Sequence, residues 1–159
     1  MLFKMKRVTS VAAVILSVTL MMTACSSHND NHGFDPKADP FALVEQAKPV
    51  ARSQHKLILV MAGGAWCHWC RALDNYIHSD ADLNKGFSDT FVAVKVYSGD
   101  EKDNKKFFST LPAAPGVPHF WVLDEHGQLL KSQGTSEFET GTDQYSKQKL
   151  LAFVQSWNR

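Results

Sequence analysis

Short apolar runs, separated by turns that contain Gly, Pro or Asp, predict four β-strands along the chain. Residues 57–61 (LILVM) are continuously apolar, which is typical of a strand buried on both faces. Residues 91–96 (FVAVKV) predict a second strand. Residues 120–123 and 128–131 flank a polar turn at 124–127, so they predict an antiparallel hairpin.

Helix signals lie before and between these strands. Asp39 and Pro40 supply an N-cap and a first-turn proline for a first helix, which we expect Pro49 to end or kink. A second helix is expected to begin near Cys67 and to run to about His78, followed by a polar turn.

Two further helices complete the pattern. Acidic residues ahead of basic ones predict a helix over residues 100–111, which Pro112 ends, and residues 150–157 repeat apolar positions at helical spacing. The order is strand–helix–strand followed by strand–strand–helix. Because a crossover helix joins parallel strands and a hairpin joins antiparallel ones, we predict an α/β fold with a mixed central sheet and helices on both faces.

Residues 1–24 have the layout of a secretory signal peptide, with a basic start, an apolar run and small residues before Cys25. A retained transmembrane helix is the alternative, but the run is shorter than the roughly 20 residues that a bilayer core requires. Residues 22–25 (MTAC) resemble the lipobox of bacterial lipoproteins, which implies cleavage before Cys25 and attachment of acyl chains such as palmitate to its thiol. The alternative to lipidation is an ordinary secreted protein that is cleaved nearby, in which Cys25 is a spare thiol.

Residues 25–39 are polar and nearly devoid of apolar side chains, so we expect a lipidated Cys25 and a flexible tether ahead of a domain at 40–159. This organisation predicts a lipid-anchored protein of the bacterial cell envelope that faces the periplasm. By resemblance to lipoprotein sorting, Ser26 favours the outer membrane over the inner one in a Gram-negative cell.

Composition and charge exclude several classes of protein. A chain of 159 residues, 44% of them hydrophobic, suffices for one compact domain but not for two ordinary ones. The formal charge of +1 depends on the basic start, and no run of basic and aromatic residues indicates nucleic acid as a partner. We also find no Ser-His-Asp set, phosphate-binding loop or paired carboxylates at convincing spacing.

Cys67 and Cys70 are the two thiols that remain after Cys25. A structural disulfide is the first expectation in an exported protein, and a Cys pair also serves zinc sites. However, a disulfide across two intervening residues constrains the unfolded chain little. At a helix start, backbone N–H groups stabilise the thiolate of Cys67, so that it could attack a partner's disulfide and Cys70 could resolve the mixed disulfide.

Residues 66–70 (WCHWC) after an apolar strand, with residues 116–118 (GVP) before another strand, resemble the thioredoxin superfamily over residues 56–159. The resemblance implies a thioredoxin-like fold, a redox-active Cys67–Cys70 disulfide and a cis Pro118 beside it. It also implies that Val117 offers backbone hydrogen bonds to an extended substrate. Within the superfamily, the chain is most similar to exported proteins such as the periplasmic terminal domain of thiol:disulfide interchange proteins.

One position departs from that pattern, because Met61 stands where thioredoxins usually carry a buried Asp that helps to move the proton of the second Cys. His68 or His119 could exchange that proton instead, since imidazole titrates near neutral pH. Trp66 and Trp69 are candidates for an apolar rim that contacts a polypeptide, although both could equally be ordinary packing residues.

The sequence therefore predicts a membrane-tethered thiol-disulfide oxidoreductase that exchanges disulfides with exported proteins and with a redox donor or acceptor protein, and that needs no cofactor. Reductase and oxidase directions are both open. One alternative is a metallochaperone that binds copper or zinc through Cys67 and Cys70, with His68 or His119 as a further candidate ligand. Another is a peptide-binding module on the same fold without redox turnover.

Overall fold

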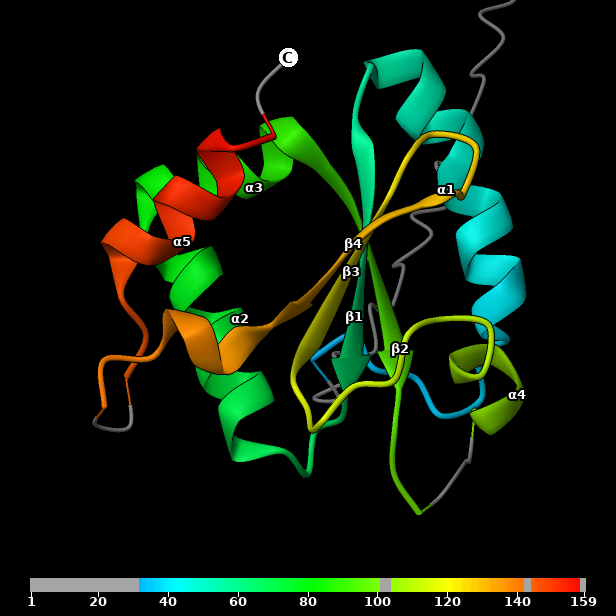
Figure 1. Ribbon diagram of the computed structural model, residues 1–159, viewed down its shortest axis with the longest axis horizontal. Helices are drawn as coiled ribbons and strands as arrows, with labels where there is room; N and C mark the ends of the chain where they lie inside the picture. Colours follow the sequence, from blue (N-terminus) through cyan, green and yellow to red (C-terminus); the bar gives the residue numbers. More distant parts are fainter. Residues whose placement is uncertain (1–31, 101–103, 142–143, 158–159) are drawn as a thin grey trace, which may run out of the picture.

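The central element is a four-stranded sheet with the strand order β2-β1-β3-β4 (Figure 1). The computed structural model describes residues 32–100, 104–141 and 144–157. The expected signal peptide, Cys25 and the first part of the expected tether lie outside these residues.

The sheet is mixed, as predicted. β1 (Leu57–Gly63) pairs in parallel with β2 (Phe91–Tyr97) and antiparallel with β3 (His119–Leu123). β4 (Leu129–Gly134) is the antiparallel neighbour of β3. The predicted crossover and the predicted hairpin are therefore both present, and they make this a thioredoxin-like α/β fold.

Helices cover both faces of the sheet (Figure 1). One face carries α2 (His68–Ser79), α3 (Ala81–Thr90) and α5 (Lys147–Gln155), and the other carries α1 (Pro40–Gln54) and the short α4 (Lys105–Phe108). A 3-10 turn, η1 (Thr135–Phe138), follows β4. Within the described part of the chain, no helix is long and apolar enough to cross a membrane.

Successive residues of β1 point into two different cores, which explains why its sequence is apolar without interruption. Every residue of the strand is buried. One set packs with α2, α3 and α5, and comprises Leu57, Leu59 and Met61. The alternate set packs with α1 and α4, and comprises Ile58, Val60 and Ala62. Each large side chain buried in this way contributes about 1.5–3 kcal/mol.

Two predicted helix boundaries need correction. α1 continues past Pro49 to Gln54, because Pro49 lies on the exposed side of the helix, where water can bond the carbonyl that the proline leaves without a donor. The helix ends instead at His55, which has a left-handed backbone with φ 55°. In the described residues, the helix expected over 100–111 is only the single turn of α4.

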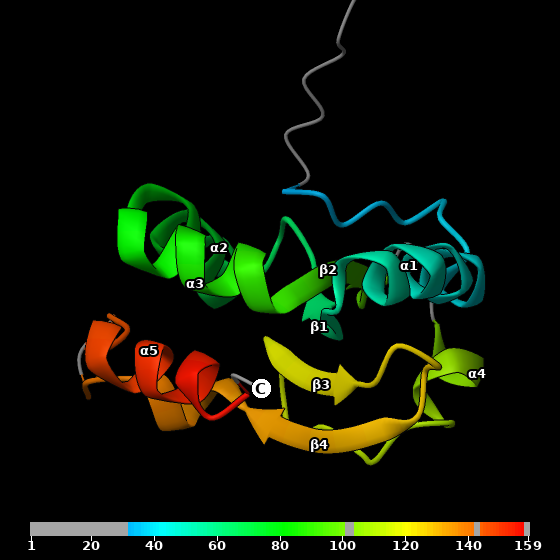
Figure 2. The same ribbon diagram turned by 90° about the horizontal axis from the view of Figure 1, so that it is seen from above.

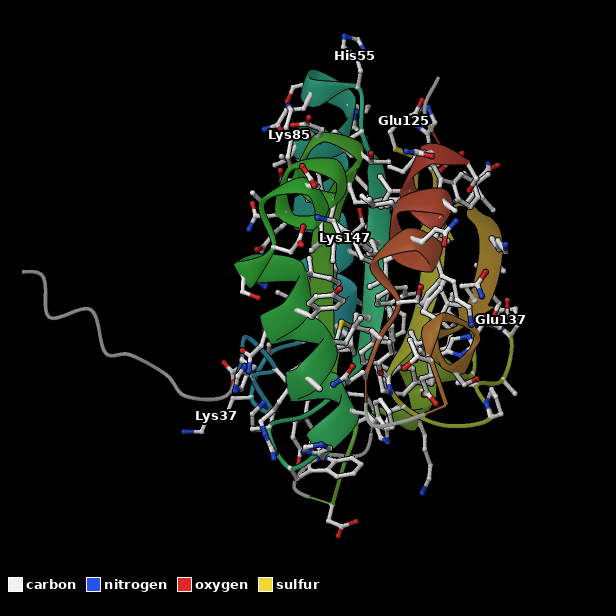
Figure 3. All side chains as sticks on the ribbon, turned by 90° about the vertical axis from the view of Figure 1, so that its left-hand side faces the viewer. Lys37, His55, Lys85, Glu125, Glu137 and Lys147 are labelled. Carbon is white, nitrogen blue, oxygen red and sulfur yellow. A yellow bond between two sulfur atoms is a disulfide. The ribbon has the colours of Figure 1, made fainter. Side chains whose placement is uncertain are left out.

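α3 occupies a stretch that the sequence pattern assigned to a polar turn. The Asp80 side chain caps it by accepting hydrogen bonds from the backbone N–H groups of Asp82 and Leu83. Lys147 at the start of α5 pairs with Asp80 and Asp82 at 2.8 and 2.7 Å, and this contact lowers the pKa of Asp80 (Figure 3). Only Leu83 and Phe87 are buried, which is too weak an apolar pattern to reveal the helix.

Residues 32–39, expected to belong to the flexible tether, lie against the domain. Phe34 is fully buried, and Lys95 of β2 donates a hydrogen bond from Nζ to the carbonyl of His32 at 2.8 Å. Figure 2 shows this segment, in blue, on the β2 side of the sheet before it joins α1. One aromatic side chain thus holds a segment whose composition alone predicts no packing.

The end of β1 is crowded. A methyl group placed on Gly63 would lie 2.7 Å from Sγ of Cys70 and 2.9 Å from Cζ of Phe34, both closer than van der Waals contact permits. By contrast, nothing lies within 4 Å of the same position on Gly116. Gly63 is therefore required by space rather than by backbone conformation.

His119 begins β3 and is buried on the α1 side of the sheet, where its ring packs on Trp121 with a centroid distance of 4.6 Å. Its Nε2 lies 2.8 Å from the hydroxyl of Ser132, whereas its buried Nδ1 has no hydrogen-bond partner among the residues that the structure describes. Burial lowers the pKa of His119 below its ordinary value of 6.5, because a charged imidazole is poorly solvated there.

We expect Gly63→Ala to lower the free energy of unfolding by about 1–3 kcal/mol, because the added methyl group overpacks the core. Gly116→Ala is the matched control and should stay within about 0.5 kcal/mol of the wild type. Urea denaturation followed by tryptophan fluorescence measures both. Equal unfolding midpoints for the two variants would contradict the crowding at Gly63.

We also expect His119 to make the fold sensitive to acid. The unfolded chain protonates this residue as the pH falls through 6.5, whereas the folded chain resists until a lower pH, so stability is lost on acidification. His119→Gln removes the titrating imidazole and with it this dependence of stability on pH. The difference in unfolding free energy between wild type and variant should therefore shrink between about pH 7.5 and pH 5. A constant difference across this range would contradict the prediction.

Candidate active site

The Cys pair lies at the N-terminus of α2, directly after β1 and its glycines. Cys67 is the N-cap residue, and its Sγ accepts a hydrogen bond from the backbone N–H of Cys70 at 3.1 Å. The two residues form a disulfide, with their Cα atoms 5.2 Å apart. The partial positive charge of the helix terminus therefore faces the sulfur of Cys67, where it stabilises a thiolate when the disulfide is reduced.

The two sulfurs differ in their surroundings. Cys67 retains 5% of its surface, whereas Cys70 is fully enclosed in the core between α2 and the sheet. Of the two cysteines, Cys67 is thus the one with some surface exposed to solvent; the roles of attacking and resolving cysteine stay predictions.

The loop before β3 forms the wall next to Cys67. The peptide bond between Val117 and Pro118 is cis, as the resemblance implied, and the carbonyl oxygen of Val117 lies 3.8 Å from Sγ of Cys67. Thr135, at the start of η1, donates a hydrogen bond to the carbonyl of Pro118 at 2.6 Å. The loop is thus held from its far side, while the half-buried Val117 stays next to the disulfide.

The two tryptophans beside the cysteines have different environments. Trp66 is 57% exposed, and its Nε1–H donates to the carbonyl of Ser98 at 2.9 Å, which fixes the ring at the surface beside the pair. Trp69 is half-buried and packs edge-on against Tyr145, with ring centroids 5.3 Å apart. Burial raises the pKa of Tyr145 to about 12, so this ring stays neutral. Of the two tryptophans beside the cysteines, Trp66 is the one that exposes a large apolar surface.

The two candidate histidines are not brought together. His68 is exposed in the first turn of α2, next to Cys67. His119 lies on the α1 side of the sheet, whereas Cys70 packs on the α2 side. Among the described residues, no group of three or more His, Cys, Asp or Glu side chains is arranged to hold a metal ion.

A partly buried ion pair, not predicted from the sequence, lies beside Met61. Met61 is buried, and its partner across the β1–β2 ladder is Lys95. Nζ of Lys95 donates to Oδ1 of Asp74 at 2.5 Å, and Asp74 is buried on α2, one turn after Cys70. Asp74 of α2 thus places a carboxylate opposite Lys95, next to Met61 in the sheet. The available signals were a lysine within an apolar strand and an acid four residues after Cys70.

Comparison with known proteins agrees with this geometry. The family model Thioredox_DsbH, described as a protein of unknown function, DUF255, matches residues 21–138. Human spermatogenesis-associated protein 20 is 26% identical over 93 residues, which are 58% of this chain and 12% of that protein. The thiol:disulfide interchange protein DsbD of Colwellia psychrerythraea is 25% identical over 113 residues, which are 70% of this chain and 18% of that protein. The chain therefore spans less than a fifth of either relative.

A solved structure gives the same fold. The disulphide isomerase from Xylella fastidiosa Temecula1 superposes with a TM-score of 0.66 at 24% identity, covering 77% of this chain and 94% of that one. The match to DsbD confirms the predicted similarity to thiol:disulfide interchange proteins. Since the family model covers well over half of the chain, this protein belongs to the Thioredox_DsbH family within the thioredoxin superfamily.

Proposed function

We propose that this protein is a thiol-disulfide oxidoreductase that exchanges disulfides with exported proteins. The observation that carries the proposal is the Cys67–Cys70 disulfide in the first turn of α2, with Cys67 as the helix cap and Cys70 enclosed behind it. A disulfide between neighbouring turns of one helix contributes little to stability, whereas its position on a helix N-terminus favours exchange.

Exchange proceeds in two steps that transfer two electrons. In the reduced protein, the Cys67 thiolate attacks a client disulfide, one client sulfur leaves as a thiolate, and a mixed disulfide forms. Cys70 then loses its proton and attacks Sγ of Cys67, so that the second client sulfur leaves and the pair becomes oxidised. The reverse sequence oxidises a client dithiol and reduces the pair.

The surroundings of Cys67 suit an extended polypeptide. The backbone of Val117, next to cis Pro118, is proposed to hydrogen-bond a client strand that lies across the disulfide. The exposed ring of Trp66 supplies an apolar contact on another side. Trp69 contributes less contact surface, because it is half-buried and packs edge-on against Tyr145.

Proton transfer at the pair is assigned to the groups nearest the helix start. The exposed His68 can exchange protons with water and with groups bound at Cys67. His119 is less suited, since its ring lies across the sheet and its hydrogen bond goes to Ser132. The role predicted for His119 stays a prediction.

The proposal includes anchoring in the cell envelope. It is supported by the signal-like residues 1–24 and by the lipobox-like segment that ends at Cys25. Acyl chains on Cys25 would hold the domain at the periplasmic side of a membrane, near exported proteins whose disulfides it exchanges.

We expect the full-length protein, titrated against glutathione and followed by tryptophan fluorescence, to show one reversible two-electron transition. Thiol alkylation of the end points should assign it to Cys67 and Cys70. The midpoint sets the direction of exchange, with reductases near about −270 mV and strong oxidants near about −120 mV.

Cys67→Ser and Cys70→Ser serve as controls for this titration. The first variant should lose client exchange altogether, whereas the second should accumulate mixed disulfides on Cys67, because the resolving thiol is missing. A wild-type pair that never exchanges with glutathione would overturn the proposed function. Assays of copper and client-peptide binding would then test the two alternatives.

A further inference from the structure

Phe34 lies in the same buried cluster as the resolving cysteine. It is the large apolar residue of the polar stretch before α1, and it is fully buried, as is Cys70. The ring and the sulfur both lie beside Gly63, because a methyl group placed on that glycine would be 2.7 Å from Sγ of Cys70 and 2.9 Å from Cζ of Phe34. The sulfur and the ring atom are thus closer together than the sum of those distances.

Lys95 contacts this segment at two points, the backbone carbonyl of His32 and the ring of Phe34. Its Nζ donates to the carbonyl of His32 at 2.8 Å and lies 5.7 Å from the centroid of Phe34. The same ammonium is paired with Asp74, and Asp74 also lies 3.4 Å from Nδ1 of His32. Gly33 adopts φ +79°, which turns the chain so that both contacts are made.

The burial of Cys70 affects which sulfur of the oxidised pair an external thiolate can attack. When an external thiolate attacks Sγ of Cys67, a bond forms between those sulfurs, the Cys67–Cys70 bond breaks, and Cys70 leaves as a thiolate that takes up a proton. Attack on Cys70 would instead leave the adduct on the buried sulfur and release Cys67. A protein with no barrier at Cys70 would form both adducts.

We propose that residues 32–39 form an N-terminal cap that closes Cys70 to external thiols and electrophiles, so that exchange is confined to Cys67, with Phe34 as the positioning residue. The inference deepens the proposed function and rests on it for its role in exchange. The barrier itself is a property of the folded chain.

The first test measures this barrier without any exchange chemistry. Reduced full-length protein is treated with iodoacetamide, and modification of Cys67 and Cys70 is followed separately by peptide mass spectrometry. In Phe34→Ala, alkylation of Cys70 should become at least about tenfold faster while that of Cys67 changes less than about twofold, because the lost ring opens a path to one sulfur. Equal acceleration at both residues would indicate general loosening and would contradict the cap.

Two further variants guard against a folding defect. Gly33→Ala strains the cap at a positive φ and brings a methyl group 3.1 Å from Cδ of Lys95, without removing any core side chain, so it should also expose Cys70. Lys37→Ala changes an exposed residue of the same segment, whose side chain points away from the domain in Figure 3, and should leave Cys70 protected. If Cys70 stays protected in Gly33→Ala and Phe34→Ala alike, the proposal is wrong.

The second test identifies which sulfur is attacked. Oxidised protein is mixed with glutathione and quenched in acid, and the residue that carries glutathione is identified by peptide mass spectrometry. The wild type should carry glutathione on Cys67, and Phe34→Ala should carry it on Cys70 as well. Exchange confined to Cys67 in every variant would contradict the cap and support the proposed function. If Phe34 protects Cys70 from iodoacetamide but neither cysteine exchanges with glutathione, the cap is supported and the proposed function is contradicted.

Discussion

The burial of β1 on both faces is the constraint on which the rest of this structure depends. Its alternate side chains close two cores, so the strand cannot shift by one residue without exchanging them. Because the register of β1 is fixed, so is the point at which the chain leaves the sheet at Gly63 and turns into α2. The position of Cys67 at the helix terminus, and therefore its electrostatic environment, follows from the packing of a strand that carries no reactive group.

Near the Cys67–Cys70 pair, β1 carries the uncharged Met61, and the carboxylate in this region is that of Asp74 on α2. Met61 adds apolar surface to β1, and the half-buried Lys95 opposite it pairs with Asp74 of α2. The pair also connects α2 to β2 and to the residues before α1.

The sequence was informative where structure is decided locally. Apolar runs located all four strands, and the spacing of Cys67 and Cys70 after a strand located the site. α3 was missed because two buried residues in ten give little periodicity. Phe34 and the Lys95–Asp74 pair were missed for another reason, since they join segments far apart in the chain and their environment exists only after the sheet has formed. Pro49 was over-interpreted because its exposure is a tertiary property.

The N-terminal cap has a mechanical consequence. Tension on the chain from its N-terminal side enters the domain at residues 32–34, so the hydrogen bond from Lys95 to His32 is loaded before the sheet is. The sheet resists through a ladder of bonds that must break together, whereas the contacts that hold the cap include the hydrogen bond from Lys95 to His32, the contact of His32 with Asp74 and the buried ring of Phe34. Under load, the contacts beside Cys70 are therefore the first to yield, while the rest of the domain remains folded.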